Sequence, residues 1–142
     1  MKRGYGLLLD THIVIWMAAE PERIPPLLRR TIEKVEKRLV SHATAWEIQI
    51  KHEKHGRRFN FSLDDLEATM KAFACTELPV QYDDIRGLNR MRFLHADPFD
   101  RMLMSQAANR NVYQATLDQN ILATFESERS FFLFADKSRE GG

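Results

Sequence analysis

The chain has 142 residues, of which 44% are apolar and 29% are charged, and its formal net charge is +1. This length and composition predict one globular domain, which we place at residues 1–135, and a flexible tail over residues 136–142. The near-neutral charge excludes a protein that attracts nucleic acid through net charge alone. The single cysteine, Cys75, excludes an internal disulfide. Together with the lack of a long apolar run, it predicts a cytoplasmic protein without a membrane span.

Short apolar runs alternate with amphipathic segments along the first part of the chain. YGLLLD (5–10) ends at an acid and is typical of a strand buried on both faces of a parallel sheet. Helices are predicted at 11–20 and at 25–38, the second with apolar residues at spacings of four and three. LVSHA (39–43) predicts a second strand, and TAWEIQIKHEKHG (44–56) predicts a helix that ends at its glycine.

The second half of the chain continues this alternation. SLDDLEATMKAFA (62–74) begins with a serine suited to cap a helix, and QYDDIRGLNRMRF (81–93) predicts a helix interrupted by a glycine. The remaining predicted elements are strands at 76–80, 112–118 and 130–136, and helices at 98–111 and 120–127. Strands separated by helices imply parallel βαβ units with helices on both faces of the sheet. We therefore expect an α/β fold, a three-layer α/β/α sandwich around a central parallel sheet of about five strands.

Polar side chains end three of the predicted strands: Asp10 the first, Ser41 the second and Asp118 the fourth. Ligands of open parallel sheets bind beyond the carboxyl ends of the strands, so these residues are candidates for a site. Each acid is also compatible with a structural role, because aspartate readily caps the helix that follows it.

Glu47 has two possible roles. The segment TAWE fits a capping box, in which the glutamate only reaches back to the start of its helix. Ser41 is an equally good cap, and from it Glu47 falls in the second turn. We expect that side of the helix, shared with Ala43, Trp46 and Ile50, to face the sheet. A carboxylate there requires a cation as partner.

Two aspartates flank the start of another predicted helix in HADPFDRMLMSQA. Proline is favoured at the first helical position, so Pro98 makes Asp97 the N-cap. Asp100 then lies at the top of the apolar stripe that continues through Leu103 and packs on the sheet. The alternative for Asp100 is a first-turn acid that only suits the helix dipole.

The acids at these helix and strand ends would repel one another without a neutralising partner. Carboxylates without soft ligands suit Mg²⁺ or Mn²⁺ and not zinc. The histidines, which show no zinc-binding spacing, are expected at the surface or beside the site. They are His12, His42, His52, His55 and His95.

Four segments, LLLDTHIVIW, SHATAWEIQIKHEKHG, HADPFDRMLMSQA and ATLD, resemble in this order the motifs of PIN-domain ribonucleases. The likeness is to the toxin subunits of VapBC-type toxin-antitoxin pairs, and it spans about residues 7–134. It implies a parallel α/β/α sandwich. It also implies a quartet of catalytic, metal-binding acids at Asp10, Glu47, Asp100 and Asp118.

The resemblance assigns Thr116 as the hydroxyl residue two positions before the last acid, and we expect Ser41 and Asp97 also to support the site. The chain departs from the family at Tyr113 and Gln114, where aliphatic residues are usual, and in the tail. The departure at Gln114 weakens the placement of the last acid.

The activity that the resemblance implies is Mg²⁺- or Mn²⁺-dependent cleavage of RNA, with 5′-phosphate and 3′-hydroxyl products. Such an ion activates water and neutralises charge on the phosphoryl oxygens. An acidic site also repels RNA, so basic residues are needed near it. The candidates are Lys51, Lys54, Arg57, Arg58 and Arg101. The alternative for this group is a solvated helix end whose charges suit the dipole.

The partners that the resemblance implies are a second copy of the chain and a small antitoxin whose C-terminal segment covers the acidic site. Trp16 and the pair Leu27 and Leu28 are candidates for that contact, although core packing also explains them.

Two other classes of function remain as alternatives. A phosphoacceptor receiver domain also has acids at parallel strand ends and would use Asp83 and Lys137. The other alternative is a non-catalytic module that binds RNA or protein on a nuclease fold.

Overall fold

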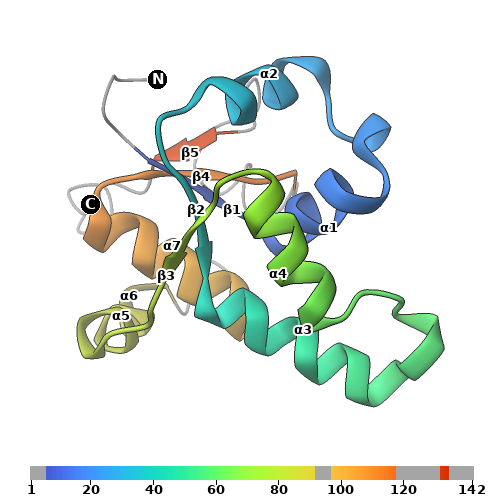
Figure 1. The fold of residues 1–142 in the computed structure, drawn as a ribbon. Coiled ribbons are helices and arrows are strands. Elements are labelled where there is room, and N and C mark those ends of the chain that lie inside the picture. Colours follow the sequence, from blue (N-terminus) through green and yellow to red (C-terminus); the bar gives the residue numbers. More distant parts are fainter. Residues whose placement is uncertain (1–5, 92–96, 118–131, 135–142) are drawn as a thin grey trace.

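The computed structural model describes residues 6–91, 97–117 and 132–134, and one sheet lies at its centre (Figure 1). The strand order is β3-β2-β1-β4-β5. The strands are β1 (Leu7–Leu9), β2 (Arg38–Ser41), β3 (Thr76–Leu78), β4 (Tyr113–Ala115) and β5 (Phe132–Phe134). β1 pairs in parallel with β2 and β4, and β2 in parallel with β3.

The predicted α/β fold with five strands is confirmed, but the expectation of a wholly parallel sheet is wrong for β5. This strand pairs antiparallel with β4. An antiparallel edge strand is common on an otherwise parallel sheet, because an edge strand must match only one neighbour.

Seven α-helices and two 3₁₀ turns, η1 and η2, complete the described part of the chain. They are α1 (Thr11–Ala19), η1 (Pro21–Arg23), α2 (Pro26–Lys34), α3 (His42–His55), η2 (Gly56–Arg58), α4 (Leu63–Ala72), α5 (Tyr82–Arg86), α6 (Leu88–Met91) and α7 (Pro98–Arg110). Gly87 separates α5 from α6, as predicted. The predicted helix at 120–127 and the tail at 136–142 lie outside the described residues. No helix within the described ranges is long and apolar enough to cross a membrane.

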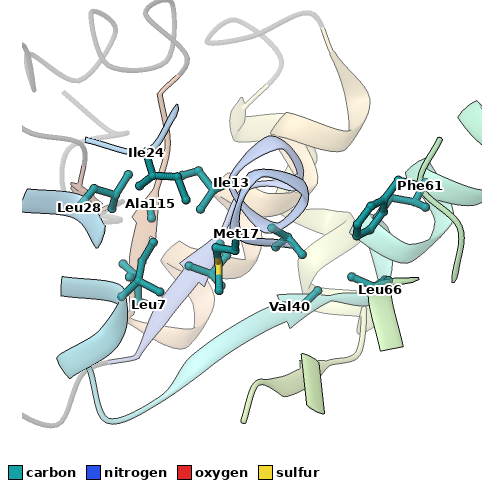
Figure 2. Close-up of a cluster of buried hydrophobic side chains, with 13 residues drawn as sticks. Leu7, Ile13, Met17, Ile24, Leu28, Val40, Phe61, Leu66 and Ala115 are labelled. Atoms are coloured by element: carbon teal, nitrogen blue, oxygen red, sulfur yellow. The ribbon is translucent and has the colours of Figure 1, made fainter. Parts of the chain in front are cut away.

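Alternate side chains of β1 divide the core into two layers. Leu7 and Leu9 pack with residues of α1, α2 and α4 (Figure 2), whereas Leu8 packs with residues of α7 on the opposite face. All three leucines are fully buried. Because successive side chains of a strand point to opposite faces, a strand that is apolar at every position must be covered on both sides. The predicted three-layer sandwich is confirmed, and so is the burial of this strand on both faces.

The boundary between β2 and α3 lies earlier than predicted, and the reason is the cap. The Ser41 hydroxyl accepts a hydrogen bond from the Ala43 N–H at 2.9 Å, so the helix begins at His42. With this start, the buried face of α3 consists of Ala43, Thr44, Glu47 and Ile48.

The expectation that Trp46 and Ile50 face the sheet together with Ala43 is wrong. The two side chains are 64% and 36% exposed. At 3.6 residues per turn, positions 46 and 50 lie about 100° and 60° from position 47, on the side opposite to the buried Thr44 and Ile48.

The start of α7 agrees with the prediction from Pro98. The Asp97 carboxylate accepts hydrogen bonds from the N–H groups of Phe99 and Asp100 at 2.8 and 3.0 Å, which makes it the N-cap. Further along the helix, Leu103 and Met104 are buried against the sheet, as expected for the apolar stripe. The helix ends at Asn111, which adopts the left-handed conformation with φ 57°.

A buried ion pair that the sequence did not suggest ties α5 to α7. Asp84 is fully buried, and its two oxygens accept hydrogen bonds from Arg110 at 2.8 and 2.7 Å. Asn109 and the N–H of Gln81 also donate to it. Burial alone raises the pKa of Asp84, but these hydrogen bonds and the positive charge of Arg110 outweigh burial and hold the pKa below its usual range.

We predict that Asp84→Asn lowers the free energy of unfolding at pH 7 by about 2 kcal/mol, because hydrogen bonds to a charged group are lost. The lowered pKa makes the wild-type contribution complete above the pKa of the unfolded chain, and it is lost as the pH falls below about 4. Urea denaturation at several pH values measures both effects. Asp83→Asn is the matched control, since Asp83 forms an exposed pair with Arg86, and should change stability by less than about 0.5 kcal/mol. Equal effects of the two substitutions would contradict this account.

We also predict that Asp97→Ala lowers the free energy of unfolding by about 1 kcal/mol, because two N–H groups of α7 lose their acceptor. Asp97→Ser should retain most of that stability, since serine caps nearly as well. Thermal and urea denaturation of the two variants check the difference. If serine destabilises the protein as much as alanine does, Asp97 does not act as a cap.

Candidate functional site

A cavity of about 350 Å³ opens where the sheet order reverses, beyond the carboxyl ends of β1 and β4. This is the position at which open α/β sheets bind ligands. The residues that line it, which we call the acidic cavity, are Asp10, Thr11, His12, Ile13, Trp16, Glu47, Lys51, Asp97, Asp100 and Leu117. Three of the four predicted catalytic acids therefore line the same cavity. They are Asp10 after β1, Glu47 on α3 and Asp100 on α7.

Asp10 lies at the N-cap position of α1, but its side chain makes no capping hydrogen bond. Its Oδ1 instead accepts a hydrogen bond of 2.6 Å from the amide of Gln114 on β4. Asp10 is only 7% exposed and Gln114 is fully buried. The side chain of Asp10 therefore does not cap α1. Gln114, at which the chain departs from the family, donates a hydrogen bond that orients this carboxylate.

Glu47 occupies the second turn of α3, because Ser41 caps the helix, and the capping-box alternative is wrong. The carboxylate is 6% exposed. Its Oε1 accepts a hydrogen bond of 2.7 Å from the Thr11 hydroxyl, and its Oε2 lies 2.8 Å from the Lys51 ammonium. The cation that such a buried carboxylate requires is thus supplied from the next turn of the same helix.

Asp97 and Asp100 both line the acidic cavity but differ in what their side chains do. Asp97 is committed to the first turn of α7 as its cap. Asp100 is half-buried at the third helical position, above the apolar stripe that fixes α7 on the sheet. The distinction drawn from the position of Pro98 therefore agrees with the structure.

Asp118 lies outside the described residues, so its position stays a prediction. Leu117 immediately before it lines the acidic cavity, and Thr116 is fully buried. The chain thus reaches the cavity one residue before the fourth predicted acid.

The possible metal ligands of the acidic cavity are mainly carboxylate oxygens, and this chemistry suits a hard divalent cation such as Mg²⁺ or Mn²⁺. Within the described ranges, however, no three His, Cys, Asp or Glu side chains lie close enough together to hold a metal ion. Both Glu47 oxygens face Thr11 and Lys51, and the fourth predicted acid, Asp118, is outside those ranges.

The five predicted RNA-binding cations occupy different environments. Lys54, Arg57 and Arg58 are exposed at the end of α3 and in η2, which project from the body of the protein in Figure 1. Arg101 is half-buried on α7. Lys51 lines the acidic cavity itself, paired with Glu47.

Two residues of this site were not singled out as functional in the sequence. Thr11 directly follows Asp10, and its position at the first turn of α1 was the available signal. Gln114 is a polar residue in the middle of a strand expected to be buried, and such a residue needs a hydrogen-bond partner. His12 is a histidine that lines the acidic cavity. His95 lies outside the described residues.

The receiver-domain alternative is not supported by the arrangement. Asp83, its proposed phosphoacceptor, is exposed on α5 beside Arg86 and does not line the acidic cavity. The strand order β3-β2-β1-β4-β5 also differs from the order 2-1-3-4-5 of receiver domains. Lys137 lies outside the described residues.

A second hollow, which is apolar, has a volume of about 410 Å³. Some of its lining residues are sequence neighbours of residues that line the acidic cavity. We call it the apolar groove. Its lining residues are His42, Ala43, Trp46, Val80, Ile85, Leu88, Pro98, Phe99 and Met102. The rings of Trp46 and Phe99 pack edge to face, with their centroids 5.4 Å apart. Trp46 directly precedes Glu47 in the sequence, and Phe99 directly precedes Asp100.

Comparison with known proteins places the chain in a family. The model of the PIN domain matches residues 7–126. The crystal structure of VapBC2 from Rickettsia felis, bound to a DNA fragment from their promoter, contains a chain that superposes with a TM-score of 0.55 at 14% identity. The match covers 78% of this chain and 86% of that one, and at this identity it shows the fold. No curated protein matches. The chain belongs to the PIN-domain family, whose members are nucleases.

Proposed function

We propose that this protein is a metal-dependent endoribonuclease and the toxin of a toxin-antitoxin pair. The observation that carries the proposal is the acidic cavity, which Asp10, Glu47 and Asp100 line from three separate elements at the ligand-binding edge of the sheet. Nothing in the core requires three carboxylates along one cavity, and their mutual repulsion is unfavourable unless cations balance it. Lys51 balances one of these charges, that of Glu47. A phosphodiesterase that uses a divalent ion requires carboxylates at its site to hold that ion.

Asp10, Asp100 and the expected Asp118 would hold a Mg²⁺ or Mn²⁺ ion, which supplies an activated water and neutralises charge on the phosphoryl group. Gln114 fixes the orientation of Asp10, and Thr11 fixes that of Glu47. Glu47 would complete the set of acids or orient the attacking water. Fixed side chains of this kind reduce the reorganisation needed during the reaction.

The RNA backbone requires cations, because the acidic cavity repels it. Lys54, Arg57 and Arg58 offer an exposed basic surface at the end of the helix that carries Glu47, and Arg101 follows Asp100. We propose that these side chains contact phosphates on either side of the cleaved bond.

A small antitoxin is the proposed inhibitor, and its C-terminal segment would cover the acidic cavity. The likeness of the fold to a chain of the VapBC2 complex supports such a partner. Of the contacts expected from the sequence, Leu28 is excluded, because it is fully buried in the core. Trp16 lines the cavity and Leu27 is 51% exposed, so both remain candidates.

We predict that the purified protein cuts RNA only with Mg²⁺ or Mn²⁺ and that Asp10→Asn slows cutting by more than about 100-fold. The reason is that loss of residues that merely support a metal ligand already reduces activity about 10- to 100-fold. Gel assays of RNA cleavage, with circular dichroism as a check on folding, measure the effect.

Asp100→Asn should be as inactive as Asp10→Asn, and Asp97→Ser is the matched control that should remain active. Cutting in the presence of chelator, or undiminished cutting by the Asp10 variant, would overturn the proposal. A protein that binds RNA but never cuts it would favour the non-catalytic alternative.

We further propose that the apolar groove is where a second copy of the chain binds to form a homodimer. Trp46 and Ile85, which line the groove, are 64% and 49% exposed, and the groove lining is almost entirely apolar. Clustered exposed side chains of this kind mark interaction surfaces, and a two-fold axis through one such patch gives a closed dimer. The acidic cavities of both copies would then lie next to the interface.

Trp46→Glu should weaken dimerisation by at least about 30-fold, because a large aromatic side chain at the centre of an interface typically contributes 2 kcal/mol or more. Sedimentation or light scattering over a range of concentrations reports the mass. Leu27→Glu alters an exposed leucine outside the groove and should leave the dimer intact. A monomeric wild-type protein, or a dimer that survives Trp46→Glu, would contradict the proposal.

A further inference from the structure

Two aromatic side chains of α1 line the acidic cavity together with its acids. His12 and Trp16 lie one turn apart on the helix, and their ring centroids are 5.9 Å apart with the ring planes tilted by 46°. His12 is exposed and Trp16 is half-buried. We call these two rings the aromatic wall of the cavity. Because α1 begins directly after Asp10, the two positions lie about 3 Å and about 9 Å along the helix axis from that acid.

A cation holds the larger ring of the aromatic wall in place. The guanidinium carbon of Arg23 lies over the Trp16 ring, 4.6 Å from its centroid, which is within the range of a cation–π interaction. Arg23 also donates a hydrogen bond of 3.2 Å to Glu20 at the end of α1. These contacts tie η1 to α1 and restrict the motion of the indole. A side chain that is already fixed loses little conformational entropy when a ligand packs against it.

Packing against the core accounts for only part of the Trp16 side chain. The residue contacts the core cluster, yet it also lines a cavity that four carboxylates line. Neither a metal ion nor the acids that hold it need an aromatic neighbour. Unpaired nucleobases do, because each has a flat π face that stacks on rings such as those of tryptophan and histidine. Stacking also supplies affinity that the acidic cavity cannot obtain from the charged RNA backbone.

We propose that the aromatic wall stacks with an unpaired nucleobase of the RNA next to the cleaved bond, so that the substrate is single-stranded at this position. A base inside a duplex is already stacked and paired and does not reach such a wall. Because every base can stack, the wall selects an unpaired strand and not a sequence. Arg23 acts through Trp16 as a positioning residue. This inference rests on the proposed RNA cleavage and deepens it, because it names the structural class of RNA that the cavity accepts.

RNA binding by the full chain, with Ca²⁺ in place of Mg²⁺ so that binding is measured apart from cleavage, tests the inference. The probes are a dye-labelled single strand of about ten adenosines and an abasic ribose-phosphate chain of the same length and charge. Fluorescence anisotropy reports their affinities. Trp16→Ala should weaken binding of the adenosine strand at least about fivefold and that of the abasic chain less than about twofold. Trp16→Phe, which keeps an aromatic ring, should weaken the former less than about threefold.

Two further variants separate stacking from an effect on folding. His12→Ala alters an exposed side chain of the same wall and should weaken binding of the adenosine strand at least about threefold. Tyr82→Ala is the matched control, because it removes an aromatic ring that is 80% exposed and does not line the acidic cavity. It should leave both affinities unchanged.

Tryptophan fluorescence gives a direct readout of the stacked base. The chain has two tryptophans, so in a Trp46→Phe background only Trp16 emits. The adenosine strand should quench this emission, because a stacked base contacts the indole. The abasic chain and a duplex of the adenosine strand with its uridine complement should not quench it.

Equal losses of affinity for the two probes in Trp16→Ala, or no quenching by the bound adenosine strand, would overturn the inference. A wild-type protein that binds the adenosine strand no more tightly than the abasic chain would also overturn it. The expected pattern of binding without any cleavage in Mg²⁺ or Mn²⁺ would instead overturn the proposed function alone.

Discussion

The arrangement of the site depends on one buried carboxylate and its two hydrogen-bonded neighbours. Glu47 can lie in the acidic cavity only because Thr11 and Lys51 compensate its burial. Its position is in turn fixed by the cap at Ser41, which starts α3 at His42 and turns position 47 inward. A cap three residues later would have made the same glutamate part of the helix start and left the cavity without it.

Much of this architecture follows from patterns that a sequence states directly. The unbroken apolar run of β1 requires cover on both faces, and Pro98 identifies Asp97 as the cap of α7 and so distinguishes it from Asp100. The register of α3 was not decidable in this way, because Ser41 and Thr44 both suit an N-cap. The exposure of Trp46 and the antiparallel direction of β5 were wrong in the prediction, since both depend on tertiary neighbours that local spacing does not encode.

Contacts between distant residues account for the features that the sequence did not reveal. Asp84 and Arg110 are 26 positions apart, and Gln114 and Asp10 are 104 positions apart. Each pair positions a part of the protein that carries a residue of the acidic cavity. The first holds α5 against α7, which carries Asp100, and the second holds the carboxylate of Asp10. A buried charge or amide predicts that a partner exists but does not identify that partner.

The central claim is that the acidic cavity exists to hold a divalent cation between Asp10 and Asp100. The most direct measurement is the anomalous difference density of a crystal of the protein grown or soaked with Mn²⁺. The account predicts a strong peak inside the cavity, within direct ligand distance of both carboxylates. A cavity without a peak at saturating Mn²⁺, or a peak bound only to Glu47 in place of Lys51, would contradict it.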